Sequence, residues 1–115
     1  MNKLRKIKTL KKNYEFKKVL TKGKFYQGKI ITAYVIKNSI EENVIGIGVS
    51  KKVGKAVKRN RAKRLIRESY RLLKNDLKKG YSFVFIWNKN VDIKSNNYFS
   101  VSKDMKNILE KAKVL

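Results

Sequence analysis

The segment 56–74 constrains the fold of this chain most, because its residues separate onto two opposite faces when it is wound as an α-helix. One face is apolar enough to lie on a hydrophobic core and consists of Ala62, Leu65, Ile66, Ser69, Leu72 and Leu73. The opposite face, which we call the basic ridge, consists of Arg59, Asn60, Lys63, Arg64, Arg67, Arg71 and Lys74. The rest of the chain must therefore supply an apolar surface for the first face and leave the second face open.

A small β-sheet is the predicted apolar surface. The segments 30–36, 44–49 and 81–87 are rich in β-branched and aromatic residues, as strands are. The third is nearly continuous in apolar residues, which is typical of a strand buried on both faces. Gly46 and Gly48 leave one face of the second strand bare, so either a neighbour packs very closely there or that strand forms the floor of a groove.

The connections and the remaining helices complete the predicted order. Gly28 is a candidate break at the start of the first strand, and residues 38–43 are predicted to form a hairpin turn. Further helices are predicted from a cap at Asn13 and from Asn96 or Asn97. The order helix, strand, strand, helix, strand, helix predicts one α+β domain over residues 1–115, with a small mixed sheet packed by helices.

The charge of the chain points to a polyanionic partner. It has 31 Lys and Arg residues against 8 Asp and Glu, a formal net charge of +23. A domain of this size repels itself at such a charge unless a polyanion such as nucleic acid, or an anionic membrane, neutralises it. Scattered lysines are also explained by codon usage in an AT-rich genome. The arginines are not, because five of the six lie between Arg59 and Arg71, and guanidinium groups bind phosphate through paired hydrogen bonds.

The alternative reading of the basic ridge is an ordinary solvated helix face, which would mix acids with bases. Glu68 is the single acid in residues 51–71, so like-charge repulsion destabilises the isolated helix. Binding to a membrane is disfavoured, because it would need an exposed apolar face and the apolar face of this helix is used by the sheet.

Several residue types are missing, and this limits the chemistry of the chain. It has no Cys and no His, which excludes thiol chemistry and removes the usual general base. The acids show no metal-ligand spacing, so no catalytic and no metal-binding residues are predicted. No apolar run is long enough to span a membrane and no secretory signal is present, so a cytoplasmic protein with a mobile basic arm over residues 1–12 is expected.

The stretch around the ridge resembles the signature of the protein component of bacterial ribonuclease P. The residues that match the family's strand, turn and helix are Gly46, Val49, Ser50, Lys51, Lys52, Gly54, Ala56, Val57, Arg59, Asn60, Arg61, Lys63, Arg64 and Arg67. Upstream, Asn13, Phe16, Val19, Gly23 and Tyr34 also fit the family pattern. The resemblance runs from about residue 10 to residue 87.

This resemblance implies a role in removing the 5′ leader from precursor tRNA, with hydrolysis carried out by a catalytic RNA that uses Mg²⁺. It implies contact with that RNA through Lys51, Lys52, Lys55, Arg59, Asn60, Lys63, Arg64, Arg67 and Arg71. It also implies a leader-binding cleft formed by Phe16, Leu20, Tyr34, Ser50 and Lys52. For Phe16 and Leu20, packing in the core is the alternative. Leu20 departs from the family, where an aromatic residue is common, and it offers a base no ring to stack on.

The resemblance further implies a left-handed crossover between parallel strands, against the usual right-handed rule. The free protein is expected to be a monomer whose partners are the catalytic RNA and precursor tRNA. A ribosomal or other structural RNA-binding protein would share the charge and the basic helix, and so would an architectural protein that coats DNA.

Overall fold

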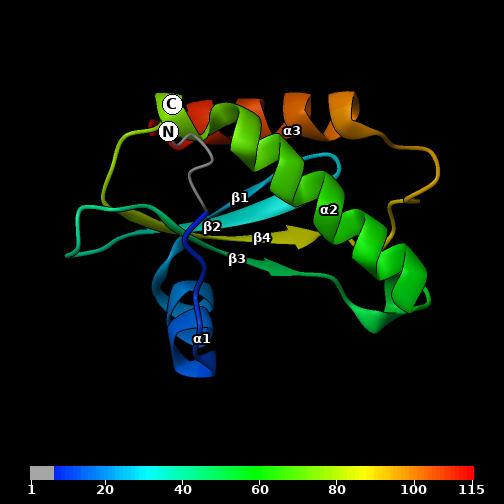
Figure 1. Ribbon diagram of the computed structural model, residues 1–115, viewed down its shortest axis with the longest axis horizontal. Coiled ribbons are helices and arrows are strands. Elements are labelled where there is room, and N and C mark those ends of the chain that lie inside the picture. Colours follow the sequence, from blue (N-terminus) through cyan, green and yellow to red (C-terminus); the bar gives the residue numbers. More distant parts are fainter. Residues whose placement is uncertain (1–6) are drawn as a thin grey trace.

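The computed structural model describes residues 7–115, in which three α-helices pack on a four-stranded sheet (Figure 1). The helices are α1 (Asn13–Lys22), α2 (Ala56–Leu73) and α3 (Tyr98–Lys111). The strands are β1 (Lys24–Gln27), β2 (Ile31–Lys37), β3 (Val44–Gly48) and β4 (Tyr81–Trp87), and short 3-10 turns η1 (Lys51–Val53) and η2 (Lys74–Asp76) flank α2. The predicted α+β class and mixed sheet are confirmed.

The predicted hairpin turn at residues 38–43 is wrong. The strand order is β1-β2-β4-β3, so β4 lies between β2 and β3 and pairs antiparallel with β2 and parallel with β3. Residues 38–43 therefore connect two strands that do not touch along their length. The physical reason is that β4 is the most apolar strand, and a central position covers both of its edges and both of its faces.

The first predicted strand is split near Gly28, which adds one strand to the predicted order. β1 and β2 form an antiparallel hairpin, and the turn between them is held by Asp104 from α3. The Asp104 carboxylate accepts hydrogen bonds from the backbone N–H groups of Lys29 at 3.0 Å, Ile30 at 2.8 Å and Ile31 at 3.0 Å. A Cβ atom at Gly28 would lie 2.6 Å from a carboxylate oxygen of Asp104, so only glycine fits this close approach.

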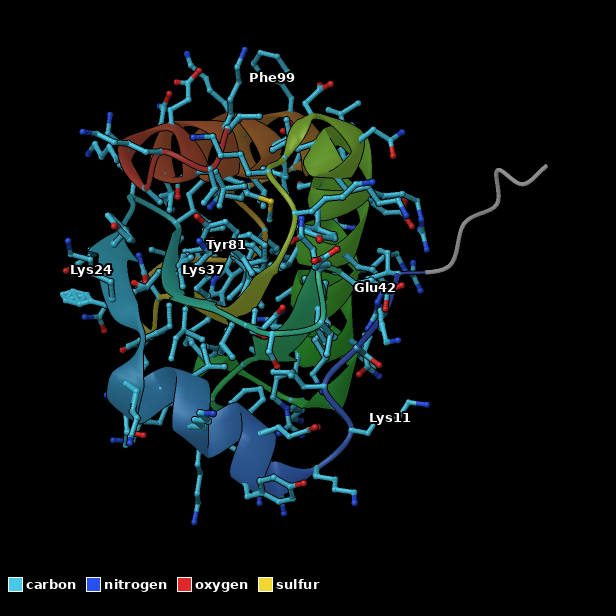
Figure 2. The ribbon with its side chains drawn as sticks, turned by 90° about the vertical axis from the view of Figure 1, so that its left-hand side faces the viewer. Lys11, Lys24, Lys37, Glu42, Tyr81 and Phe99 are labelled. Carbon is cyan, nitrogen blue, oxygen red and sulfur yellow. The ribbon has the colours of Figure 1, made fainter. Side chains whose placement is uncertain are left out.

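The connection from β3 through α2 to β4 is a left-handed crossover. In Figure 1, β3 and β4 point the same way and α2 lies above them. Figure 2, which is turned by 90°, shows that β3 is nearer than β4 to the viewer of Figure 1. The second strand therefore lies to the left of the first when the helix faces the viewer, as the resemblance implied and against the usual rule.

The helices divide between the two faces of the sheet. α2 and α3 cover one face and enclose the main core, whereas α1 lies on the other face (Figure 1). Phe83, Phe85 and Trp87 of β4 point into the main core together with Met105 and Ile108 of α3. This arrangement leaves much of the α1 side of the sheet without a second helix.

The apolar face of α2 is rotated from the predicted one. Leu72 was expected in the core but is 58% exposed, whereas Tyr70 is 2% exposed. The Tyr70 ring lies 6.2 Å from the Phe83 ring and 5.9 Å from the Phe85 ring, measured between centroids. The large ring finds an aromatic surface on β4, and the helix turns so that Leu72 faces solvent.

Two expectations about the start of the chain need correction. Lys12 rather than Asn13 is the N-cap of α1, and the Glu15 carboxylate accepts the backbone N–H of Lys12 at 3.1 Å. Residues 1–6 of the expected basic arm lie outside the described residues. Residues 8–10 pair with β3: the Leu10 N–H donates to Ile45 O (2.9 Å) and the Ile45 N–H donates to Lys8 O (3.0 Å). These residues therefore continue the edge of the sheet and do not form a mobile arm.

Candidate nucleic-acid interface

The basic ridge lies on the outer face of α2, opposite the residues that pack on the sheet. Asn60, Arg64, Arg67 and Arg71 are exposed. Arg59 and Lys63 are half-buried at the border between the ridge and the core face. The predicted ridge is thus a continuous surface of one helix.

Three of the ridge arginines form no ion pair within the described residues. Within residues 7–115, Arg71 is the ridge arginine that forms an ion pair, with its Nη1 atom 2.8 Å from an Oε2 atom of Glu68. Arg59, Arg64 and Arg67 form no ion pair with a carboxylate in this part of the chain. A surface that keeps several guanidinium groups unpaired is suited to an anionic ligand.

Arg59 also has a buried hydrogen-bond donor without a partner among the described residues. This donor is its Nε atom. A buried donor without an acceptor costs about 1–3 kcal/mol.

The segment that leads into α2 is cationic as well. Lys51, Lys52 and Lys55 are exposed, and no acidic residue lies in the first turn of α2. Lys55 is the N-cap and makes no side-chain cap, so the first N–H groups of the helix keep their positive partial charge. The predicted RNA-binding lysines thus lie at an end of the helix that already favours phosphate.

Ser50 has a structural role in this segment. Its hydroxyl oxygen accepts the backbone N–H of Lys52 at 3.1 Å and caps the turn η1. η1 positions the lysines between the end of β3 and the start of α2.

Phe16, a predicted cleft residue, explains the bare face of β3. A Cβ atom added at Gly46 would lie 2.8 Å from the Phe16 ring, and one at Gly48 would lie 3.5 Å from it. Close packing, one of the two predicted explanations, therefore applies, and Phe16 is half-buried against these glycines. Leu20, one turn further along α1, is also half-buried.

Tyr34 lies on the α1 side of the sheet beside an aromatic residue that the sequence reasoning missed. Phe25 of β1 pairs across the hairpin with Tyr34, their ring centroids are 5.9 Å apart, and Phe25 is 52% exposed. We call Tyr34 and Phe25 the aromatic pair. It provides the exposed ring that Leu20 lacks, and only the register of the β1–β2 hairpin brings its two residues together.

The described residues contain no constellation for hydrolysis by the polypeptide. Within residues 7–115, no group of three acidic side chains is arranged to hold a metal ion. Asp104, the buried acid, is fully engaged with backbone N–H groups of the hairpin turn.

Comparison with known proteins identifies the family. A family model described as Ribonuclease P matches residues 4–113. The chain belongs to the ribonuclease P protein family. The resemblance noted in the sequence around the basic ridge is therefore confirmed over nearly the whole chain.

Members of the family agree with this chain in sequence and in structure. The ribonuclease P protein component of Clostridium botulinum (strain 657 / Type Ba4) is 46% identical over 104 residues, which cover 90% of this chain and 92% of that protein. The one from Clostridioides difficile (strain 630) is 40% identical, with 95% of each chain covered. The RNase P protein of Staphylococcus aureus superposes with a TM-score of 0.82 at 30% identity and covers 95% of this chain and 98% of its own. The RNase P protein from Thermotoga maritima gives a TM-score of 0.81 at 28% identity, covering 93% and 97%.

No helix within residues 7–115 has the length and apolar character needed to cross a lipid bilayer.

Proposed function

We propose that this family member is the RNA-binding subunit of a ribonuclease P holoenzyme that removes the 5′ leader from precursor tRNA. The observation that carries this proposal is that Arg59, Arg64 and Arg67 of the basic ridge form no ion pair within residues 7–115, which leaves them available for the phosphates of a folded RNA. The catalytic RNA is the proposed partner of the ridge and of the three lysines that precede α2.

The catalytic RNA is proposed to carry out the hydrolysis, with Mg²⁺ held mainly by that RNA and by the substrate. Mg²⁺ is bound in proteins through one or two carboxylates plus phosphate oxygens. The described residues offer no such acidic cluster, and the chain has no His to act as a base. The role of the protein is then to lower the repulsion between the catalytic RNA and the precursor tRNA. This raises the affinity of the holoenzyme for its substrate and for Mg²⁺.

The leader of the precursor is proposed to bind on the α1 side of the sheet. Phe16, Leu20, Tyr34, Ser50 and Lys52 remain the candidate contacts, and Phe25 joins them as the partner of Tyr34. Unpaired bases stack on exposed aromatic rings, and nearby lysines hold the phosphates. The protein is proposed to act in the cytoplasm and, because its charge of +23 opposes self-association, to be monomeric before it binds RNA.

The direct experiment mixes the pure protein with the catalytic RNA and a precursor tRNA at low Mg²⁺. We expect faster cleavage than with the RNA alone. An Arg67→Ala variant should bind the catalytic RNA more weakly, with a salt dependence of log K that is shallower by about one unit because one phosphate contact is lost. Binding measured at several salt concentrations gives this slope.

The matched control is Lys106→Ala, which removes one positive charge from the exposed face of α3. It should leave the salt slope unchanged. Cleavage no faster than with the RNA alone would contradict the proposal and favour a structural RNA-binding role. Equal effects of Arg67→Ala and Lys106→Ala would show that net charge, not the ridge, governs binding.

A further inference from the structure

A concave surface lies on the same side of the sheet as α1 but on the opposite flank of that helix from the candidate leader contacts. It is a groove of about 700 Å³ between residues 8–12, α1 and the connection that follows β2, and we call it the arm groove. Tyr14 and Lys18 of α1 line it. Because α1 turns by about 100° per residue, Phe16 and Leu20 lie on its other flank, and neither lines the groove.

The walls of the arm groove are apolar and its mouth carries exposed side chains. Leu10, Ile36 and Val44 form part of the walls. At the mouth, Tyr14 is 66% exposed and Ile40 is 50% exposed. The groove therefore offers a ring and an aliphatic surface that solvent reaches freely.

Lysines surround this apolar surface and outnumber Glu15, the acid in its lining. Lys8, which also lines the groove, forms an ion pair with Glu42. Lys11, Lys12, Lys18 and Lys37 line the groove, and the Nζ atom of Lys12 lies 5.8 Å from the centre of the Tyr14 ring. The Glu15 carboxylate is already bonded to the backbone N–H groups at residues 11 and 12, at 3.2 Å and 3.1 Å. Figure 2 shows Lys11 pointing outward from the segment that precedes α1.

We propose that the arm groove binds unpaired nucleotides of the precursor leader upstream of those held on the aromatic pair. This proposal rests on the proposed function. An aromatic ring bordered by cations is the arrangement that binds single-stranded nucleic acid, with the base on the ring and the phosphates on the lysines. A duplex does not present the faces of its bases in this way, which favours the leader over a structured region of the catalytic RNA.

The position and size of the groove fit this occupant. Its volume lies in the range of about 300–1,000 Å³ found for sites that enclose a small ligand, such as a nucleotide. It is separated from the candidate leader contacts by one helix, which is about 10–12 Å wide including its side chains. A single strand that leaves the aromatic pair can therefore continue into the arm groove by crossing α1.

The test compares two precursor tRNAs that differ only in leader length. The short leader ends at the nucleotides held near Tyr34, and the long leader continues with an unpaired stretch. The holoenzyme is assembled with wild-type protein or with a Tyr14→Ala variant, and the affinity for each precursor is measured by fluorescence titration. Tyr14→Ala should weaken binding of the long leader about 5- to 100-fold and leave binding of the short leader unchanged, because one base loses its stacking partner.

A Tyr98→Ala variant is the matched control, because Tyr98 is an exposed tyrosine at the start of α3. It should bind both precursors as the wild type does. As a second measurement, photocrosslinking of wild-type holoenzyme with 4-thiouridine in the upstream leader should label the peptide that contains Tyr14.

The other outcomes overturn the proposal. Equal affinities of Tyr14→Ala and wild type for the long leader, together with absence of the crosslink, would show that the groove is not a leader site. Loss of affinity for the catalytic RNA in the absence of precursor would assign the groove to that RNA instead. A wild-type protein that stimulates cleavage of neither precursor would contradict the proposed function itself.

Discussion

At the residue scale, the ridge is not uniform. Arg67 is unpaired, whereas Arg71 is held by Glu68 at 2.8 Å on the same helix. Both members of this pair are about half exposed, with side-chain exposures of 46% and 47%. An exposed pair of this kind contributes between zero and about 1 kcal/mol to stability. Under the proposed function, we therefore expect Glu68 to lower the RNA affinity of the ridge by more than it contributes to the stability of the fold.

A Glu68→Gln variant tests this balance. It removes the single acid of the ridge segment and frees Arg71 for a phosphate, so the affinity for the catalytic RNA should rise several-fold and the salt slope should become steeper by up to about one unit. Thermal unfolding should change by little. Filter binding at several salt concentrations measures the slope, and weaker binding would show that Glu68 positions Arg71 for the RNA.

Tyr70 is the residue whose chemistry the core alters most. Burial disfavours the charged phenolate and raises the pKa of Tyr70 from 10.0 to about 12. Below pH 10 the hydroxyl is neutral in both the folded and the unfolded chain, and stability is unaffected. Between pH 10 and 12 the unfolded chain ionises while the folded chain does not, so the free energy of unfolding should fall by about 2–3 kcal/mol.

Urea unfolding of wild type and Tyr70→Phe across this pH window checks that expectation. The loss of stability attributed to Tyr70 should be missing in Tyr70→Phe. If both proteins lose stability equally between pH 10 and 12, the alkaline transition belongs to other groups.

At the scale of elements, the contact of α1 with β3 decides how the α1 side of the sheet is shaped. Gly46 is buried under the Phe16 ring, and a Cβ atom there would lie 2.8 Å from this ring, so a larger residue would displace Phe16. Gly46 therefore limits how closely Phe16, and with it α1, can approach the sheet. That approach in turn separates the aromatic pair from the arm groove.

A Gly46→Ala variant should destabilise the protein by about 1–3 kcal/mol, because the added methyl group displaces Phe16 and with it α1. In a Phe16→Leu background the same change should cost less, since the smaller side chain leaves room. A double-mutant cycle by urea denaturation measures this coupling. Additive effects would show that Phe16 does not provide the constraint.

At the scale of the whole molecule, net charge opposes folding and, under the proposed function, favours RNA binding. The charge of +23 is distributed over a domain with a Cα radius of gyration of 13.3 Å, so like charges repel one another across the whole surface. In the free protein nothing offsets this repulsion, whereas in the proposed complex the phosphates of the RNA offset it. Stability and RNA affinity should therefore respond to salt in opposite directions.

Raising the salt concentration from about 0.01 M to about 1 M shortens the Debye length from about 30 Å to about 3 Å. The Tm of the free protein should rise by about 5–10 °C as repulsion is screened. Over the same range the affinity for the catalytic RNA should fall by orders of magnitude. Differential scanning calorimetry and filter binding in the same buffers measure both, and a Tm that falls with salt would contradict this account of the charge.

The sequence alone was sufficient for the local features. The spacing of apolar and basic residues predicted α2 and its outward ridge, and the continuous apolar run predicted the buried strand β4. These patterns are periodic within one element, so each can be recognised without its neighbours. The unpaired arginines follow from composition, since few acids are present to pair with them.

The tertiary structure decided every feature that depends on which elements are neighbours. The position of β4 between β2 and β3, the exchange of Tyr70 for Leu72 in the core, the aromatic pair and the arm groove all arise from contacts between residues far apart in the chain. Such contacts are selected by the packing of whole faces against one another, and a one-dimensional pattern records only which face is apolar, not what it meets.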